Sequence, residues 1–183
     1  MMYYLLYFIA EAPFRLVRRI PAGLLKRRRN ICSTGNAALD MPAIRILIVD
    51  DHAIVREGLK TILAKSHDFA VAGEAANAPD AMSALRNVPV DMVLLDIGLP
   101  GKTGVDLLKT IKLEWPKLPV LVLSTYPEDQ YALRVLKQGA AGYLTKESAP
   151  ELLTSAVRKV AAGGKYVSAA TAERLLSEIG TDS

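Results

Sequence analysis

Short apolar runs that alternate with helical segments constrain the fold of this chain more than any other feature of its sequence. The first run, Ile44–Val49, is rich in β-branched residues and ends at Asp50-Asp51, which is typical of a strand buried on both faces of a parallel sheet. Four later runs have the same character. They predict strands over residues 69–73, 92–95, 120–123 and 142–144.

Helical periodicity fills the intervals between these runs. Apolar residues recur at helical spacing over 53–65, and similar patterns cover 79–87, 105–115, 128–138 and 151–162. Parallel strands require crossover connections, and these connections are right-handed. We therefore predict an α/β fold, a doubly wound sheet of five parallel strands with helices on both faces. The 51% of hydrophobic residues is ample for its core and excludes a disordered or fibrous protein.

Polar residues that could carry chemistry follow the carboxyl ends of the predicted strands, where such sheets bind ligands. They are Asp50 and Asp51 after the first strand, Asp96 after the third, Ser124 after the fourth and Lys146 after the fifth. The opposite ends of the strands carry only isolated charges, which we expect to be ordinary solvated residues: Arg45, Asp91 and Lys117.

Three carboxylates at one edge of a sheet repel one another, so they are expected to recruit a cation. Mg²⁺ prefers oxygen ligands and is typically held by one or two carboxylates together with a phosphate. Mg²⁺ and Lys146 would balance the three negative charges before any phosphoryl group arrives. We therefore expect a Mg²⁺ site and covalent transfer of phosphate to Asp96, with Lys146 and the Ser124 hydroxyl placed to bind the new oxygens.

Four segments, together with the spacing between them, carry a family resemblance. They are Ile-Val-Asp50-Asp51-His52, Leu-Leu-Asp96-Ile-Gly-Leu-Pro100-Gly101, Val-Leu-Ser124 and Ala-Gly-Tyr143-Leu-Thr-Lys146. Residues 44–163 thereby resemble a bacterial two-component response regulator receiver domain of the NarL/FixJ type. The resemblance implies a flavodoxin-like sheet with the strand order 2-1-3-4-5. It also implies a phosphoacceptor signalling domain that catalyses only its own phosphorylation and dephosphorylation, and is otherwise not an enzyme.

The resemblance also implies a metal-binding role for the acidic residues. Asp96 would be the phosphoacceptor and a Mg²⁺ ligand, Asp51 a direct ligand, and Asp50 a ligand acting mainly through water. The backbone carbonyl of Gly98 would complete the metal shell. The implied phosphodonor is a sensor histidine kinase.

A switch is implied at the other side of the site. Lys146 and Ser124 would bind the phosphoryl oxygens, and the movement of the Ser124 hydroxyl would vacate space that the ring of Tyr143 fills as it turns inward. A phosphorylation-dependent homodimer, formed through the fourth and fifth helices, is a further implication of the resemblance.

Two departures from the commonest receiver pattern carry predictions. Glu147 follows Lys146 where many receivers have proline, and a cis bond before a residue other than proline costs about 3–4 kcal/mol, so we expect a trans bond. Gly98 lacks a side chain that could position an attacking water, and Tyr126 lacks a carboxylate or amide. We therefore expect slow self-dephosphorylation.

Simpler interpretations of several residues stay open. Asp50-Asp51 could be a helix N-cap, although the matching strand ends at Asp96 and Lys146 argue against it. We expect His52 to be a residue of the first helical turn rather than a ligand or base, and His67 to be a loop residue. With these two histidines and the single Cys32, the chain has neither an internal disulfide nor a set of four zinc ligands. We expect a reducing, cytoplasmic location.

The leader, residues 1–41, differs from the rest of the chain. It holds seven basic residues against two acidic ones, a net charge of +5, whereas the following 142 residues hold 16 against 17, a net charge of −1. Charge therefore does not indicate a nucleic-acid surface on the body. An amphipathic membrane-surface helix is one interpretation of the leader. We favour two others, that the leader is disordered or that translation starts at Met41, and we expect the leader to make no membrane contact.

The predicted receiver domain covers 42–163, and residues 164–183 form a linker with a short amphipathic helix over 169–179. Its apolar stripe of Leu175, Leu176 and Ile179 indicates a helix that packs against a further part of the protein. We expect DNA binding only through an output domain that this chain does not contain. A stand-alone receiver that acts by phosphotransfer or protein contact is the alternative, and a metal-dependent phosphatase is a weaker third interpretation.

Overall fold

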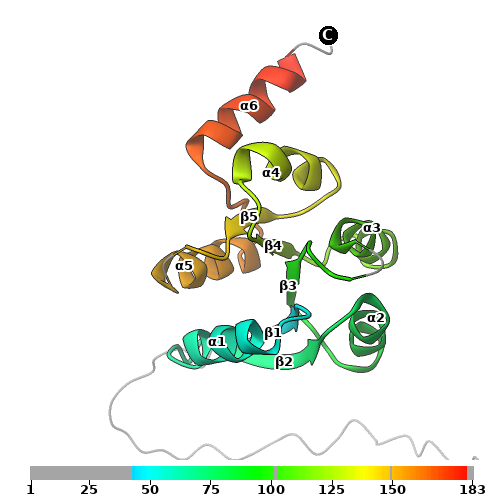
Figure 1. Cartoon of the computed structure of the whole chain (residues 1–183). Coiled ribbons are helices and arrows are strands. Elements are labelled where there is room, and N and C mark those ends of the chain that lie inside the picture. Colours follow the sequence, from blue (N-terminus) through cyan, green and yellow to red (C-terminus); the bar gives the residue numbers. More distant parts are fainter. Residues whose placement is uncertain (1–42, 101–102, 149, 181–183) are drawn as a thin grey trace, which may run out of the picture. The chain divides into compact units, whose positions relative to one another are not determined.

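The computed structural model describes residues 43–100, 103–148 and 150–180. The predicted leader, residues 1–41, lies outside the described residues. Strands and helices alternate along the described part (Figure 1). The elements are β1 (Ile44–Val49), α1 (Ala53–Leu63), β2 (Phe69–Ala75), α2 (Ala78–Asn87), β3 (Met92–Asp96), α3 (Gly104–Glu114), β4 (Val120–Ser124), α4 (Glu128–Lys137), β5 (Gly142–Thr145), α5 (Pro150–Ala161) and α6 (Ala169–Gly180).

The strands form one parallel sheet in the order β2-β1-β3-β4-β5. This order and the parallel pairing confirm the predicted fold class. At the carboxyl edge, Val49 pairs with Leu95, and Asp96 is the last residue of β3. Ser124 ends β4 and pairs with Thr145 of β5. The strand ends therefore bring the polar residues of the predicted site to the same edge of the sheet.

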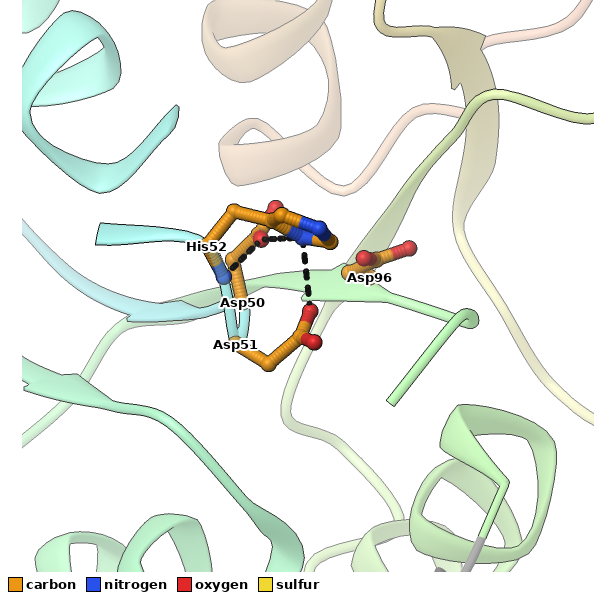
Figure 2. A group of neighbouring side chains, drawn as sticks. All are labelled: Asp50, Asp51, His52 and Asp96. Carbon is orange, nitrogen blue, oxygen red and sulfur yellow. Dashed lines mark hydrogen bonds and ion pairs between the residues drawn. The ribbon is translucent and has the colours of Figure 1, made fainter. Parts of the chain in front are cut away.

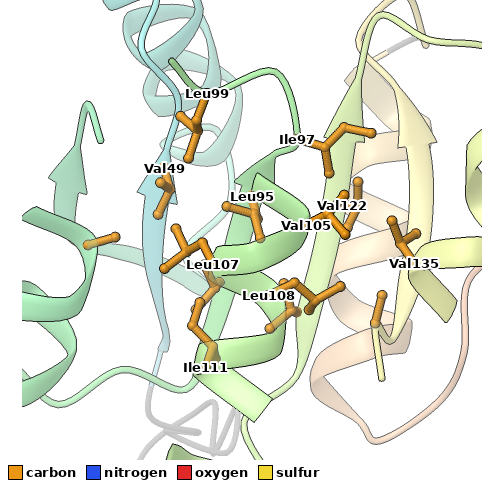
Figure 3. Packing of buried hydrophobic residues seen from close by; sticks show 14 of the residues in the cluster. Val49, Leu95, Ile97, Leu99, Val105, Leu107, Leu108, Ile111, Val122 and Val135 are labelled. Atoms are coloured by element: carbon orange, nitrogen blue, oxygen red, sulfur yellow. The ribbon is translucent and has the colours of Figure 1, made fainter. Parts of the chain in front are cut away.

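Alternating residues of each strand supply two separate cores. Leu47 and Val49 face a cluster that includes residues of α2, α3 and α4, and Figure 3 shows part of this packing. Ile46 and Ile48 face the opposite cluster, which includes residues of α1 and α5. Burial on both faces explains why the strands are nearly continuous apolar runs.

Most boundaries lie within two residues of the predictions. β2 extends to Ala75, two residues beyond the predicted end, because Glu74 and Ala75 continue to pair with β1. α1 ends at Leu63, two residues before the predicted end. The Lys65 N–H donates to the carbonyl of Ile62, three residues back, as in a turn.

The helix starts differ in how they are capped. α2 and α3 begin after Asn77 and Thr103, whose side chains accept hydrogen bonds from the backbone N–H groups of Asp80 and Asp106 at 2.9 Å and 3.3 Å. α1 instead begins after His52, whose side chain makes no capping hydrogen bond. Neither Asp50 nor Asp51 is the N-cap residue, so the capping interpretation of this pair is wrong. His52 precedes the first turn instead of lying within it.

The α6 helix contacts α4. The N–H of Ser168 donates to Glu128 Oε1 at 2.9 Å, and Arg174 donates to the carbonyl of Asp129 at 2.7 Å. Leu176 is 70% exposed, whereas Leu175 is half-buried. The predicted apolar stripe of α6 is therefore only partly exposed to solvent. The side chain of Ile179 lies outside the described residues, and none of the described helices is long and apolar enough to cross a membrane.

Candidate functional site

Two carboxylates and a lysine meet at the carboxyl edge of the sheet. Asp50 follows β1 and is 1% exposed, and Asp96 ends β3 and is 4% exposed. Lys146 follows β5 and reaches both, with its Nζ 2.6 Å from Asp96 Oδ2 and 2.7 Å from Asp50 Oδ2. Three separate strand ends thus build one buried charged group.

Asp51 and His52 extend this group toward solvent, with side chains that are 28% and 62% exposed. Figure 2 shows both beside Asp50 and Asp96. Asp51 Oδ1 lies 2.8 Å from His52 Nδ1, and Asp50 Oδ1 lies 3.4 Å from the same nitrogen. The backbone N–H of His52 also donates to Asp50 Oδ1 at 2.9 Å. One potential ligand atom from each of Asp50, Asp51, His52 and Asp96 lies within 4.8 Å of the others.

The donor set of this cluster fits a divalent metal ion. Asp50 Oδ2 and Asp51 Oδ1 are buried oxygens whose contacts are with the side chains of Lys146 and His52, at 2.7 Å and 2.8 Å, rather than with backbone N–H groups. Carboxylate oxygens are the ligands that Mg²⁺ prefers. Gly98 lies on the loop after Asp96, and its N–H donates to Asp96 Oδ1 at 2.8 Å. The role of its carbonyl as a metal ligand stays a prediction.

Burial and charge act in opposite directions on Lys146. Burial lowers its pKa, but contacts with the carboxylates of Asp50 and Asp96 outweigh this effect and hold the pKa above its ordinary value. Lys146 is therefore a fixed positive charge at neutral pH. Its peptide bond to Glu147 is trans, as expected, since no cis bond occurs in the described part of the chain.

Ser124 and Tyr143 lie on the other side of the site. Ser124 is fully buried, and its Oγ accepts a hydrogen bond from the N–H of Tyr126 at 3.0 Å. The Tyr143 hydroxyl donates to the carbonyl of Tyr126 at 2.8 Å. Tyr143 is 1% exposed, so its ring already lies inward, and burial raises the pKa of its hydroxyl.

Sequence reasoning missed two contributions to this site. Tyr126 connects Ser124 to Tyr143 through its backbone, which its side chain could not reveal. Arg56 of α1 donates to the carbonyl of Asp50 at 2.7 Å and pairs with Glu74 of β2 at 3.2 Å. In the sequence, the position of Arg56 near the start of the predicted helix is the one feature that could have indicated this contact.

A parallel sheet in this order with an acidic cluster and a lysine at its carboxyl edge defines a class of signalling domain. Residues 46–158 match the family model of the response regulator receiver domain, and the chain belongs to this family. Its relatives are NarL/FixJ, or LuxR-type, response regulators. One is the transcriptional regulatory protein DegU of Brevibacillus brevis, with 36% identity over 143 residues, 78% of this chain and 61% of DegU.

Solved structures give the same assignment. The two-component response regulator of the LuxR family from Aurantimonas sp. SI85-9A1 is 33% identical, with a TM-score of 0.68, and the match covers 74% of this chain and 97% of that chain. A structure of two RcsB dimers bound to two parallel DNAs has 26% identity and a TM-score of 0.66, covering 73% of this chain and 68% of that chain. In the comparison with the curated relatives, the chain spans about three fifths of the length of DegU.

Proposed function

We propose that this receiver accepts a phosphoryl group on Asp96 from a sensor histidine kinase in a Mg²⁺-dependent reaction. The observation that carries the proposal is the position of Lys146, whose Nζ lies within 2.7 Å of both Asp50 and Asp96. A buried carboxylate held beside a fixed cation and two further carboxylates is suited to gain and keep a phosphoryl group.

Different residues of the site have different roles in this phosphoryl transfer. An oxygen of Asp96 attacks the phosphorus of a phosphohistidine, the P–N bond breaks, and the imidazole of the donor leaves. Asp50, Asp51 and Asp96, with the Gly98 carbonyl, would hold Mg²⁺, which supplies charge neutralisation at the phosphoryl oxygens when bound. Lys146 binds one of these oxygens. The domain catalyses only its own phosphorylation and dephosphorylation.

Ser124 and Tyr143 are proposed to report the phosphorylated state. A Ser124 hydroxyl that turns to the phosphoryl group gives up the hydrogen bond from the Tyr126 N–H, which is 3.0 Å long. The adjoining Tyr126 carbonyl accepts from Tyr143, so the ring and the loop before α4 respond together. Two states of this loop would change the surface offered to a partner.

Control of transcription is the output we propose. It is supported by the relationship to a transcriptional regulator, DegU, and to RcsB, which forms dimers on DNA. A phosphorylation-dependent homodimer and a DNA-binding output domain outside this chain would carry that function. A stand-alone receiver that acts by phosphotransfer or protein contact is the alternative. The mass of the native protein separates the two, because an output domain would add several kilodaltons.

The direct test is phosphorylation of the full chain by acetyl phosphate with Mg²⁺, followed by intact mass measurement. We expect one added phosphoryl group, which Asp96→Ala abolishes and removal of Mg²⁺ prevents. Asp129→Ala, which alters an exposed carboxylate of α4, is the matched control and should be phosphorylated normally. Labelling that survives Asp96→Ala would overturn the site assignment, and turnover of phosphate esters without an added mass would support a phosphatase instead.

A further inference from the structure

His52 is a polar residue of the acidic cluster that the phosphorylation chemistry does not use. It occupies the N-cap position of α1, but its side chain makes no capping hydrogen bond. Instead, its Nδ1 lies 2.8 Å from Asp51 Oδ1 and 3.4 Å from Asp50 Oδ1 (Figure 2). The imidazole is thus directed to the carboxylates rather than to the helix.

The carboxylates beside His52 retain ligand capacity. Asp50 is 1% exposed, and the contact of its Oδ2 is the ion pair with Lys146 Nζ at 2.7 Å. Asp51 Oδ1 is likewise a buried oxygen, and its contact is the one with His52 Nδ1 at 2.8 Å. A metal ion bound by both Asp51 Oδ1 and the imidazole would replace their present 2.8 Å contact.

The separations within the cluster suit shared coordination. Nitrogen and oxygen ligands lie about 2.0–2.2 Å from a first-row divalent ion, so neighbouring ligands at right angles are roughly 3 Å apart. The two contacts of His52 Nδ1, 2.8 Å and 3.4 Å, lie on either side of this value. One ion could thus be reached by the imidazole and both carboxylates with small adjustments. His52 has room for them because its side chain is 62% exposed.

We propose that His52 Nδ1 is a metal ligand, and that the site therefore binds imidazole-preferring first-row divalent ions such as Co²⁺ and Ni²⁺ more tightly than Mg²⁺. The proposal rests on the metal site of the proposed function and adds a nitrogen ligand to its oxygens. Imidazole ligands favour transition ions, whereas sites of carboxylate and water alone suit Mg²⁺. Ligation requires the neutral ring with its proton on Nε2.

Co²⁺ is the probe for this proposal, because its unpaired electrons shift the proton resonances of a ligating imidazole far outside the normal NMR range. The full chain would be titrated with Co²⁺ and, separately, with Mg²⁺ by calorimetry, and NMR spectra would be recorded of the Co²⁺-loaded protein. We expect shifted imidazole resonances in the native protein. His52→Gln should remove them and weaken Co²⁺ binding by about tenfold or more, with little change in Mg²⁺ binding.

His67→Gln is the matched control, since His67 is the other histidine and lies exposed in the turn between α1 and β2. It should leave the shifted resonances and both affinities unchanged. Circular dichroism of His52→Gln verifies that the variant is folded.

Three outcomes would overturn the proposal. Co²⁺ binding without shifted imidazole resonances excludes a histidine ligand. Persistence of the resonances in His52→Gln excludes His52. Equal weakening of Co²⁺ and Mg²⁺ means that the imidazole only positions Asp51 through a hydrogen bond. Each of these leaves the proposed function intact as long as Mg²⁺ binds and Asp96 is phosphorylated. If neither Co²⁺ nor Mg²⁺ binds, both the His52 proposal and the proposed function are overturned.

Discussion

The hydroxyl of Tyr143 donates a 2.8 Å hydrogen bond to the backbone carbonyl of Tyr126. The first residue lies in the middle of β5, and the second lies in the loop that leads from β4 into α4. The same loop is held from the other side, because the Tyr126 N–H donates to Ser124 Oγ. One peptide segment therefore connects a residue at the acidic site with a ring buried in the core.

Replacement of Tyr143 by phenylalanine removes this hydrogen bond and keeps the ring. Because the hydroxyl is buried and its partner carbonyl loses a donor, we expect Tyr143→Phe to lower the free energy of unfolding by about 1 kcal/mol. Urea unfolding followed by circular dichroism measures the change. Tyr166→Phe, which alters a half-buried ring beneath Lys159, is the control. An equal loss in both variants would show that the Tyr126 contact contributes nothing particular.

Lys146 compensates two buried carboxylates, so its removal should be costly. Without Mg²⁺, Lys146→Met leaves Asp50 and Asp96 buried and unpaired, and we expect a loss of about 3 kcal/mol in the free energy of unfolding at neutral pH. Saturating Mg²⁺ should restore part of the loss. Lys109→Met, at an exposed lysine of α3, should change stability by less than about 0.5 kcal/mol. A Lys146→Met protein as stable as the native one would contradict this account of the site.

Gly98 determines the expected lifetime of the phosphoryl group. The Cβ of a side chain at this position would lie 3.4 Å from the carboxylate oxygens of Asp96, which is ordinary contact, so the backbone accommodates a substitution. The amide of an asparagine could hold an attacking water, and we expect Gly98→Asn to lose the phosphoryl group faster than the native protein. Decay of the phosphorylated mass after removal of the phosphodonor measures this. A native half-life equal to or shorter than that of the variant would refute the prediction.

The ion pair of Arg45 and Asp91 should be visible in the pH dependence of stability. Arg45 holds the pKa of Asp91 at about 2 through hydrogen bonds to its carboxylate. A lowered carboxyl pKa stabilises the fold fully above the unfolded value of about 3.9 and loses that effect as the pH falls toward 2. We therefore expect the stability difference between the native protein and Asp91→Asn to shrink between pH 5 and pH 2.

Urea unfolding at intervals across that range gives the difference. Both groups are about two-fifths exposed, so the effect is screened and small. In an Arg45→Met background the Asp91→Asn difference should lose most of its pH dependence, because only the backbone N–H of residue 45 still donates to Asp91 Oδ2. If the difference in the free energy of unfolding between the native protein and Asp91→Asn stays constant with pH, the ion pair does not contribute to stability as expected.

The strands and the acidic edge could be predicted because both follow from short-range patterns. Burial on two faces produces continuous apolar runs, and parallel strands carry their carboxyl ends to one edge. Asp50, Asp96 and Lys146 accordingly meet where the sequence placed them. Their roles in phosphoryl transfer are predictions that depend on the family resemblance and on the experiments above.

Contacts between distant side chains could not be predicted in the same way. Arg45 and Asp91 are 46 residues apart, and their pairing depends on β1 and the start of β3 lying side by side. The contact of α6 with α4 depends likewise on the side chains of Glu128 and Arg174, whose partners are backbone groups 40 and 45 residues away. Amphipathicity predicts that α6 has an apolar face but does not identify what that face meets.

The alternation of core residues along β1 has a consequence for the charged edge beyond it. Side chains of a strand point to opposite faces in turn, so a slip of one residue in the pairing of β1 would exchange the two faces. Ile46 and Ile48 would then meet the core of Leu47 and Val49, and Asp51 would take the buried place of Asp50. Aliphatic residues that touch no ion therefore select which carboxylate faces Lys146.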